Sequence, residues 1–466
     1  MISRVERLLI CSAVLYVLVL GWAMVNISYD LWGAFVLLPV LVLAMLAILR
    51  RVFPHEYPGL YRIAVIGLVA KFGVVFVRYF IAFQSYSGFS DSGDYDLNAK
   101  VIAGNIRSGV RSPLELIPRG TGTQFIEHFL ASNYVVIGAS RLAGFFVFAW
   151  LAYWGTVMFM RAAMIAVPGL DHRRYAYLMF LLPSVLYWPA SIGKEALIYF
   201  GIGIASIGVA HILAGRWSLF ALLCVVGGLV FAGMVRPHFA AMWVGGLVVA
   251  LIAGLFKRRS ERGSVGRFGT VVFILVALVA LGALGAATLK FLDQRSNTVN
   301  TAGPVTSQII KLFAAANTRT DQGGSSFRTI SINGPLDWPF AIVRTLTRPL
   351  LNEARSFAEL IPAVEMTILI LLAFVNWRRL FNLFPMMRRS SYVVFAVVVT
   401  MVFGLAFSSI GNLGLLTRQR SLVMPLFVLP FAFPTWVSHR KARPAADAGS
   451  VGSLRAARSV GTMVSR

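Results

Sequence analysis

The feature that most constrains this chain is the recurrence of long apolar runs along almost its whole length. Many runs are about 18 to 25 residues long, which is the length an α-helix needs to cross roughly 30 Å of hydrocarbon. Hydrophobic residues make up 58% of the 466 residues and charged residues only 13%, whereas soluble domains carry about 25% charged residues. The sequence therefore predicts an all-α membrane protein, a polytopic bundle of transmembrane helices.

About twelve runs predict membrane spans, and together they predict one transmembrane domain over residues 1–437. The fifth run contains Pro183, which is expected either to kink the helix or to break it in two. Lys71 falls deep inside the third run and needs a partner that the sequence does not identify. The predicted spans are residues 8–25, 32–49, 63–83, 141–160, 175–189, 196–214, 217–234, 239–256, 268–289, 357–375, 391–409 and 420–437.

The basic residues predict the orientation of this bundle. Short cytoplasmic loops accumulate Lys and Arg. Threading the chain with both termini in the cytoplasm places the basic segments "KRRSERGSVGR" and "NWRRLFNLFPMMRRSS" on that side. Two long loops, about residues 84–140 and 290–356, then lie on the outer side. The tail, residues 438–466, is rich in Ala, Gly, Ser and Arg and is expected to be a disordered basic cytoplasmic segment.

Each long outer loop contains a segment that predicts a helix lying at the membrane interface. "GTQFIEHFLASNYVVIGASRL", which carries Glu127 and His128, is too short and too polar for a confident span. We expect an amphipathic helix at the outer interface or a re-entrant piece. "PLDWPFAIVRTLTRPL" places Trp338 and Phe340 at headgroup level and its arginines toward phosphates. We interpret His128 as a structural residue.

The formal net charge of +25 does not predict a nucleic-acid partner. Nucleic-acid binding needs a folded basic face or a binding module, whereas the basic residues here lie mostly at the ends of apolar runs, so the predicted partner is the lipid bilayer. The sequence contains no phosphate-binding loop, nucleophile elbow, zinc-binding helix motif or dinucleotide fingerprint. Both cysteines, Cys11 and Cys224, fall inside apolar runs and predict neither a disulfide nor a metal site.

Three acidic residues, Asp91, Asp94 and Asp96, follow the third predicted span in "SDSGDYDLNAK". Carboxylates clustered at a membrane surface suit either a general base or the oxygen ligands of a divalent cation. We predict that Asp94 is the base and that Asp91 or Asp96 orients it, with Asp94 and Asp96 as candidate metal ligands. The alternative is an acidic turn or helix cap built on Ser and Asp.

The stretch "LPSVLYWPASIGKEALI" sets Lys194 beside Glu195 between two apolar runs, at the predicted outer mouth of the bundle. An ammonium group there suits a phosphate ligand, and a carboxylate in the first turn of a helix is stabilised by the helix dipole. "GMVRPHFAA" offers Arg236 for a phosphate and His238 for proton transfer. In each case the alternative is a polar turn between spans.

Two further outer segments carry cations, at the entrances of the tenth and twelfth predicted spans. Several basic segments on one side predict an anionic ligand, a lipid phosphate at the outer leaflet. The predicted phosphate-binding residues are Lys194, Arg236, His238, Arg418 and Arg420, with Glu195, Arg348, Glu353 and Arg355 in a supporting role.

The stretches "FLLPSVLYWPASIGKEALIYFGIGIA", "RPH" and "GNLGLLTRQRSLVMP" resemble those of a group of uncharacterised actinobacterial multi-spanning proteins, over roughly residues 60–437. The chain is more loosely similar to membrane glycosyltransferases of the GT-C type and to polysaccharide polymerases, in its many spans, acidic outer loop and basic outer loops. That resemblance implies sugar transfer from a polyprenyl-phosphate or polyprenyl-diphosphate donor on the outer face. It also implies an outer-loop aspartate as base, matched by Asp94 or Asp91. In many members of that class the acidic loop follows the first span, and here it follows the third.

We therefore expect an enzyme of the bacterial plasma membrane that transfers a sugar or oligosaccharide from a polyprenyl carrier to a cell-envelope glycan. One alternative is a transporter or flippase of a lipid-linked glycan, which should show charges within spans and access from both leaflets. The other is a non-catalytic subunit of an envelope assembly complex. The sequence leaves open the sugar, the acceptor, the linkage, a need for a divalent cation and the oligomeric state.

Overall fold

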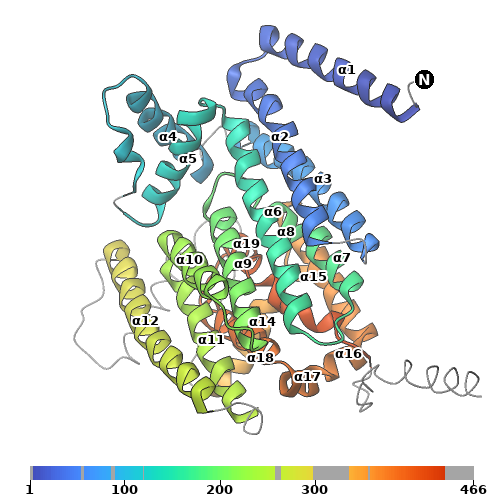
Figure 1. Cartoon of the computed structure of the whole chain (residues 1–466), viewed down its shortest axis with the longest axis vertical. Coiled ribbons are helices and arrows are strands. Elements are labelled where there is room, and N and C mark those ends of the chain that lie inside the picture. The colour runs from blue at the N-terminus through green and yellow to red at the C-terminus, as the bar shows by residue number, and fades with distance from the viewer. Residues whose placement is uncertain are drawn as a thin grey trace, which may run out of the picture.

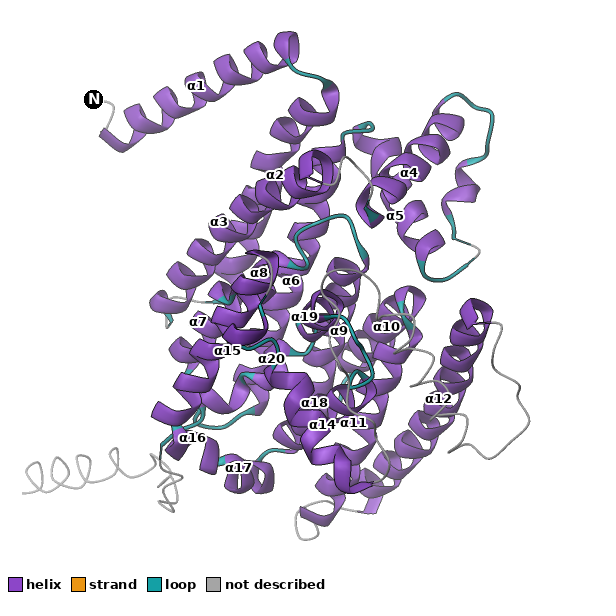
Figure 2. Ribbon diagram, turned by 180° about the vertical axis from the view of Figure 1, so that it is seen from behind, coloured by secondary structure: helices purple, strands orange, loops and turns teal. Residues whose placement is uncertain are grey.

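The computed structural model describes residues 4–53, 57–85, 90–118, 120–257, 264–296, 335–354 and 357–435. In these residues every regular element is a helix and none is a strand. Most of the helices lie alongside one another, and α4 and α5 sit together at one end of the bundle (Figures 1 and 2). The prediction of an all-α fold is confirmed.

Six helices in the described part of the chain are long and apolar enough to cross a membrane, or seven if a pair bent by 77° forms one span. This number of apolar helices indicates a membrane-embedded protein. The predicted count of about twelve spans is not confirmed. The six are α2 (Tyr29–Val52), α3 (Pro58–Phe80), α6 (Arg141–Ala166), α9 (Lys194–Leu213), α11 (Pro237–Lys257) and α12 (Ser264–Ser296).

The remaining apolar helices are shorter or bent. The bent pair joins α15 (Phe357–Val375) to the segment that contains α16 (Trp377–Phe381) and α17 (Leu383–Arg389). The helices with shorter apolar stretches are α1 (Arg4–Asn26), α10 (Leu219–Val235) and α18 (Ser391–Ala406).

Two of the predicted spans are not continuous helices. Residues 175–189 form the end of α7 (His172–Leu181) and the five-residue α8 (Pro183–Tyr187). Pro183 has no N–H to continue the helix and holds Leu182 in an extended conformation (φ −65°, ψ 125°). Of the two outcomes expected at Pro183, a kink or a break, the structure shows the break.

Residues 420–437, the other interrupted span, contain only short helical pieces. These are the last residue of α19 (Leu413–Arg420), then α20 (Met424–Phe427) and the 3₁₀-helix η5 (Leu429–Ala432). A proline lies at the start of each of the last two pieces, where it fits a first helical turn but not a helix interior.

The core of the bundle is built around α9, which packs closely between α6 and α10. A Cβ atom placed on Gly203 would lie 2.6 Å from the Cα atom of Gly155 on α6, and one on Gly201 would lie 2.8 Å from the carbonyl oxygen of Gly228 on α10. Small residues let helix backbones approach this closely. Seventeen of the twenty residues of α9 are buried, so its position is fixed on all sides.

The predicted interfacial segments are helical. The first contains α5 (Thr123–Ile137), and the second contains α14 (Trp338–Thr347), where Trp338 and Phe340 are exposed. The rest of the second loop, residues 297–334, lies outside the described residues, as does the predicted tail, 438–466. The first loop also forms α4 (Asp91–Arg107), a helix that the sequence did not predict.

Helix α5 is anchored on the end of α10, which places α4 and α5 over the start of α9. The Gly122 amide donates to the Met234 carbonyl oxygen at 2.7 Å, and the Phe125 and Phe129 rings both contact the ring of Phe231. Because these contacts cross about a hundred residues of sequence, only the tertiary fold creates them.

Candidate functional site

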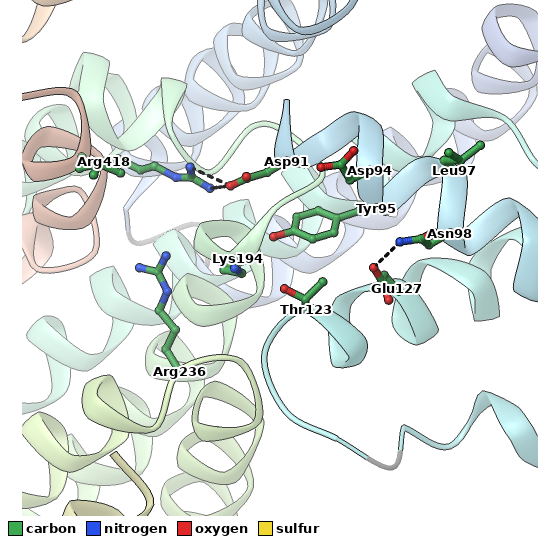
Figure 3. A pocket seen from close by; sticks show the side chains of 11 residues that line it. Asp91, Asp94, Tyr95, Leu97, Asn98, Thr123, Glu127, Lys194, Arg236 and Arg418 are labelled. Atoms are coloured by element: carbon green, nitrogen blue, oxygen red, sulfur yellow. Dashed lines mark hydrogen bonds and ion pairs between the residues drawn. The ribbon is translucent and has the colours of Figure 1, made fainter. Parts of the chain in front are cut away.

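A cavity of about 560 Å³ opens between the α4 and α5 pair and the bundle (Figure 3). On the bundle side it is bounded by the start of α9, the turn between α10 and α11, and α19. The cavity combines acidic and basic side chains from segments that are far apart in sequence. Its charged lining residues are Asp91, Asp94, Glu127, Lys194, Arg236 and Arg418.

Helix α4 supplies most of the acidic wall. The chain enters it from Ser90, which is extended at the N-cap (φ −147°, ψ 157°), and Asp91 and Asp94 fall in the first turn, where the helix dipole stabilises a carboxylate. Asp94 and Asn98 are four residues apart and lie on one side of the helix; both line the cavity. The acids therefore occupy a helix start, as the alternative interpretation of the sequence held, and two of them also face the cavity.

Helix α5 adds a carboxylate that the sequence did not single out as a site residue. Thr123 and Glu127 are one helical turn apart and line the cavity beside the residues of α4. The Asn98 amide donates to Glu127 Oε1 at 2.7 Å, which ties the two helices together. The only sequence signal for Glu127 was its place on a predicted polar-faced helix.

Arg418 of α19 joins the two sides of the cavity. Its Nη1 and Nη2 atoms each lie 3.2 Å from Asp91 Oδ2, and its Nε lies 2.7 Å from Glu195 Oε1. Burial by itself lowers the pKa of Arg418, but the carboxylates of Glu195 and Asp91 outweigh burial and raise it overall. The guanidinium group therefore stays charged at the cavity wall.

Glu195 lies beneath the lining and organises the basic side. Its side chain is 3% exposed, and its Oε1 atom accepts from Gln419 Nε2 at 3.4 Å and lies 3.9 Å from Arg236 Nη2. Arg236 donates in turn to the Gln419 side-chain oxygen. One buried carboxylate thus orients two guanidinium groups, and Gln419, which the sequence did not flag, completes the network.

Lys194 is the first residue of α9 and is only 8% exposed. Its Nζ atom lies 5.9 Å from the centre of the Tyr95 ring, within cation–π range. Burial, followed by the charge of Asp91, raises the pKa of Tyr95, so its hydroxyl keeps its proton at neutral pH and can donate to a ligand. Figure 3 shows Lys194 and Arg236 facing Tyr95 across the cavity.

Asp96, which the sequence predicted as a site residue, does not line the cavity. Its carboxylate is 3% exposed, accepts from the Tyr134 hydroxyl at 2.5 Å and from Arg141 Nε at 2.8 Å, and lies 3.2 Å from Lys100 Nζ. Two residues along a helix correspond to a rotation of about 200°, so Asp96 points away from the face that carries Asp94. It holds α4 against α5 and α6.

Arg420 and His238 also lie outside the lining. Arg420 is fully buried and donates to the carbonyl oxygens of Leu346, at 3.2 Å, and of Arg348. His238 is half-buried, and its ring lies 5.0 Å and 5.9 Å from the rings of Phe239 and Phe407. In the structure, Arg420 thus makes hydrogen bonds to main-chain oxygens and His238 makes ring contacts, and neither side chain lines the cavity.

The supporting residues near the tenth span form a separate group. Arg348 Nη2 lies 2.6 Å from Glu353 Oε1, and Glu353 also caps the backbone amide of Leu350 at 3.0 Å. Neither side chain lines the cavity. Arg355 lies outside the described residues.

The predicted pair of metal ligands, Asp94 and Asp96, is divided between two faces of α4. Within the described residues, no group of three or more His, Cys, Asp or Glu side chains is arranged to hold a metal ion. The carboxylates that share the cavity with Asp94 are Asp91 and Glu127. A divalent cation there would depend on ligand oxygens, such as those of a phosphate, to complete its shell.

The cavity therefore offers two kinds of chemistry in one space. The α4 and α5 wall presents carboxylates, an amide and hydroxyl groups, which can accept from and donate to the hydroxyls of a polar ligand. The opposite wall presents two guanidinium groups and an ammonium group, which suit an anion such as a phosphate.

A likeness in fold would not by itself establish a function, and the resemblance drawn from the sequence stays a prediction. Searches of protein-family models, curated proteins and solved structures each find no match for this chain.

Proposed function

We propose that this protein transfers a sugar or oligosaccharide from a polyprenyl-phosphate or polyprenyl-diphosphate carrier to a cell-envelope glycan at the outer face of the bacterial plasma membrane. The observation that carries the proposal is the shared cavity: Asp94 and Glu127 on one wall, and Lys194, Arg236 and Arg418 on the other. A glycosyl phosphate needs both walls, since its sugar is rich in hydroxyls and its phosphate is anionic.

In this reaction the acceptor hydroxyl oxygen bonds to the anomeric carbon of the donor sugar as the bond from that carbon to the phosphate oxygen breaks. The electron pair stays on the phosphate, where Arg236, Arg418 and Lys194 stabilise the charge. Asp94 takes the proton of the attacking hydroxyl as general base. Asp91 contacts Arg418 at 3.2 Å, so in this proposal it orients that guanidinium group toward the phosphate.

The distribution of arginines supports an outer position for the cavity. Arginines gather at the end of the bundle away from α4 and α5 (Figure 1), where α2 ends, α7 begins, and α16 and α17 lie. Cytoplasmic loops accumulate such residues. These arginines are Arg50, Arg51, Arg173, Arg174, Arg378, Arg379, Arg388 and Arg389.

A lipid-linked glycan flippase is the second candidate, favoured by the broken helix α7–α8 and by Lys71 within α3. Transporters use discontinuous helices and intramembrane charges at their substrate sites. Lys71 is 1% exposed, however, and its ammonium group contacts protein carbonyl oxygens. This observation favours the enzyme.

The test is the profile of lipid-linked glycans and finished surface polysaccharide in cells that carry Asp94→Asn at equal membrane levels of protein. Loss of a general base is expected to slow transfer about a hundredfold or more, with carrier-linked precursor accumulating on the outer leaflet. Glu115→Gln is the matched control, because Glu115 is an exposed acid between α4 and α5 that does not line the cavity. Precursor trapped on the inner leaflet would favour the flippase, and an unchanged profile would refute the proposal.

The outer position has its own test. Leu97 lines the cavity and is 64% exposed, so Leu97→Cys in a chain lacking Cys11 and Cys224 should react with a membrane-impermeant maleimide in intact cells. Labelling only after the cells are broken would place the cavity in the cytoplasm and end the proposal.

A further inference from the structure

Charged side chains inside the bundle converge on α8 and on the residues that lead from it to Lys194. Two of them, Lys71 and Arg78, come from α3, and the third, Glu365, comes from α15. None of the three lines the cavity. Charges at such depth are costly and are kept where they have a role.

Glu365 holds the first turn of α8. Its Oε2 atom accepts from the backbone amide of Ser184 at 2.5 Å, and the residue is only 3% exposed. This amide follows Pro183 at the break, so no preceding helical turn offers it a carbonyl partner. The carboxylate therefore satisfies a backbone group that the break exposes in the interior.

Lys71 holds the other end of α8. Its Nζ atom donates to the carbonyl oxygens of Val185 and Leu186, each at 3.0 Å. These carbonyls belong to the last turn of a short helix, where backbone acceptors lack amide partners. The partner that Lys71 requires is thus a pair of main-chain oxygens, which no reading of side-chain types along the sequence would reveal.

Arg78 continues the support toward the cavity. Its guanidinium group lies 4.7 Å and 5.6 Å from the rings of Tyr187 and Trp188, and it donates to the Tyr187 hydroxyl at 3.2 Å and to Ser191 Oγ at 2.9 Å. From the cavity side, Ser92 Oγ donates to the Ile192 carbonyl oxygen at 2.7 Å. Residues 184–192 are held along their length, directly before Lys194.

We propose that Lys71, Arg78 and Glu365 are positioning residues that fix residues 183–192 and thereby hold Lys194 in the cavity wall and Glu195 beneath it. Their charges act on main-chain and side-chain groups of this segment, which forms a rigid support and not a moving gate. The inference rests on the proposed function only in assuming that the cavity binds a lipid phosphate.

The experiment measures two quantities on the full chain in lipid nanodiscs. The first is the Kd for undecaprenyl phosphate, and the second is amide hydrogen exchange over residues 184–193. Lys71→Met should weaken binding about tenfold or more, since charged donors make the stronger hydrogen bonds, and should speed exchange in this segment. Lys71→Arg keeps the donors and should restore much of both.

Arg62→Met is the matched control, because it removes a cation from the same helix at an exposed position; neither quantity should change. If Lys71→Met fails to fold, Tyr187→Phe tests the same segment more gently by removing one acceptor of Arg78. It should speed exchange at residues 187–191 and weaken binding by about twofold to fivefold.

The outcomes separate this inference from the proposed function. A folded Lys71→Met protein, or Tyr187→Phe in its place, with unchanged exchange and unchanged Kd would overturn the inference and leave the function standing. A wild-type protein that binds no undecaprenyl phosphate would count against the function, while the exchange measurement would still decide whether Lys71 holds the segment.

Discussion

The ion pair between Arg418 and Glu195 leads to a prediction about stability that follows from its geometry. Glu195 Oε1 lies 2.7 Å from Arg418 Nε, and the Glu195 side chain is 3% exposed. Arg418→Met leaves this carboxylate with Arg236 at 3.9 Å and Gln419 at 3.4 Å. Removing one partner of a buried ion pair lowers the free energy of unfolding by about 3 to 5 kcal/mol. We expect a loss of about 3 kcal/mol because these two contacts remain.

The reciprocal change, Glu195→Gln, is expected to cost less, about 2 kcal/mol, because Arg418 keeps its contact with Asp91. The double variant Arg418→Met/Glu195→Gln removes both charges and leaves neither member of the pair alone. We therefore expect the double variant to lose about 3 kcal/mol of unfolding free energy, whereas the losses of the two single variants sum to about 5 kcal/mol. The difference is a coupling energy of about 2 kcal/mol between the two residues.

The free energies of unfolding can be measured by SDS titration in mixed micelles, with tryptophan fluorescence as the signal. Arg418→Lys keeps the charge without the planar fork of donors, so its stability should lie between those of wild type and Arg418→Met. If the two single changes add to within about 0.5 kcal/mol in the double variant, the two side chains do not form the coupled pair and this reasoning is wrong.

Three further predictions follow from other contacts. Arg236→Gln should weaken binding of undecaprenyl phosphate about tenfold in a Kd measurement, because Arg236 lines the cavity. Asp96→Asn should lower the free energy of unfolding by about 2 to 3 kcal/mol and leave carrier binding unchanged, because Asp96 faces Tyr134 and Arg141. Gly203→Ala should destabilise the protein by about 1 to 3 kcal/mol, since its Cβ would lie 2.6 Å from the Gly155 backbone.

Each of these predictions has a control or a contrary outcome. Gly73→Ala on α3, whose Cβ would meet nothing within 4 Å, should leave the stability near that of wild type; equal losses at Gly73 and Gly203 would contradict the packing argument. A stable Asp96→Asn protein that no longer binds the carrier would return Asp96 to the site. Unchanged binding in Arg236→Gln would remove Arg236 from the basic wall.

The sequence predicted the class of this protein because the controlling property is local. A run of about 20 apolar residues favours a membrane-spanning helix whatever surrounds it, and Pro183 interrupts a helix through its own ring and missing N–H. The number of spans was harder to predict from the sequence. The run at residues 420–437 is apolar enough to cross a membrane, yet its prolines divide it into short pieces that pack within the protein.

The sequence also predicted which types of side chain the site contains, but not which individual residues would lie together in the cavity. Asp94 and Asp96, like Arg418 and Arg420, are two residues apart, so a helix turns them about 200° from each other. One member of each pair lines the cavity, and the other is buried in contacts with neighbouring elements. The sequence does not show that α4 and α19 are helices or which faces they bury. From the sequence alone, the two members of each pair are therefore equivalent.

By itself, then, the sequence determined an all-α membrane-embedded chain, a kink or break at Pro183, and a set of acids and cations suited to an anionic ligand. The tertiary structure alone decided that Glu127 joins Asp94, that Glu195 orients Arg236 and Arg418 from below, and that Lys71 bonds to main-chain oxygens. The physical reason is that these contacts join segments up to about two hundred residues apart, and hydrogen bonds and ion pairs act only over a few ångströms.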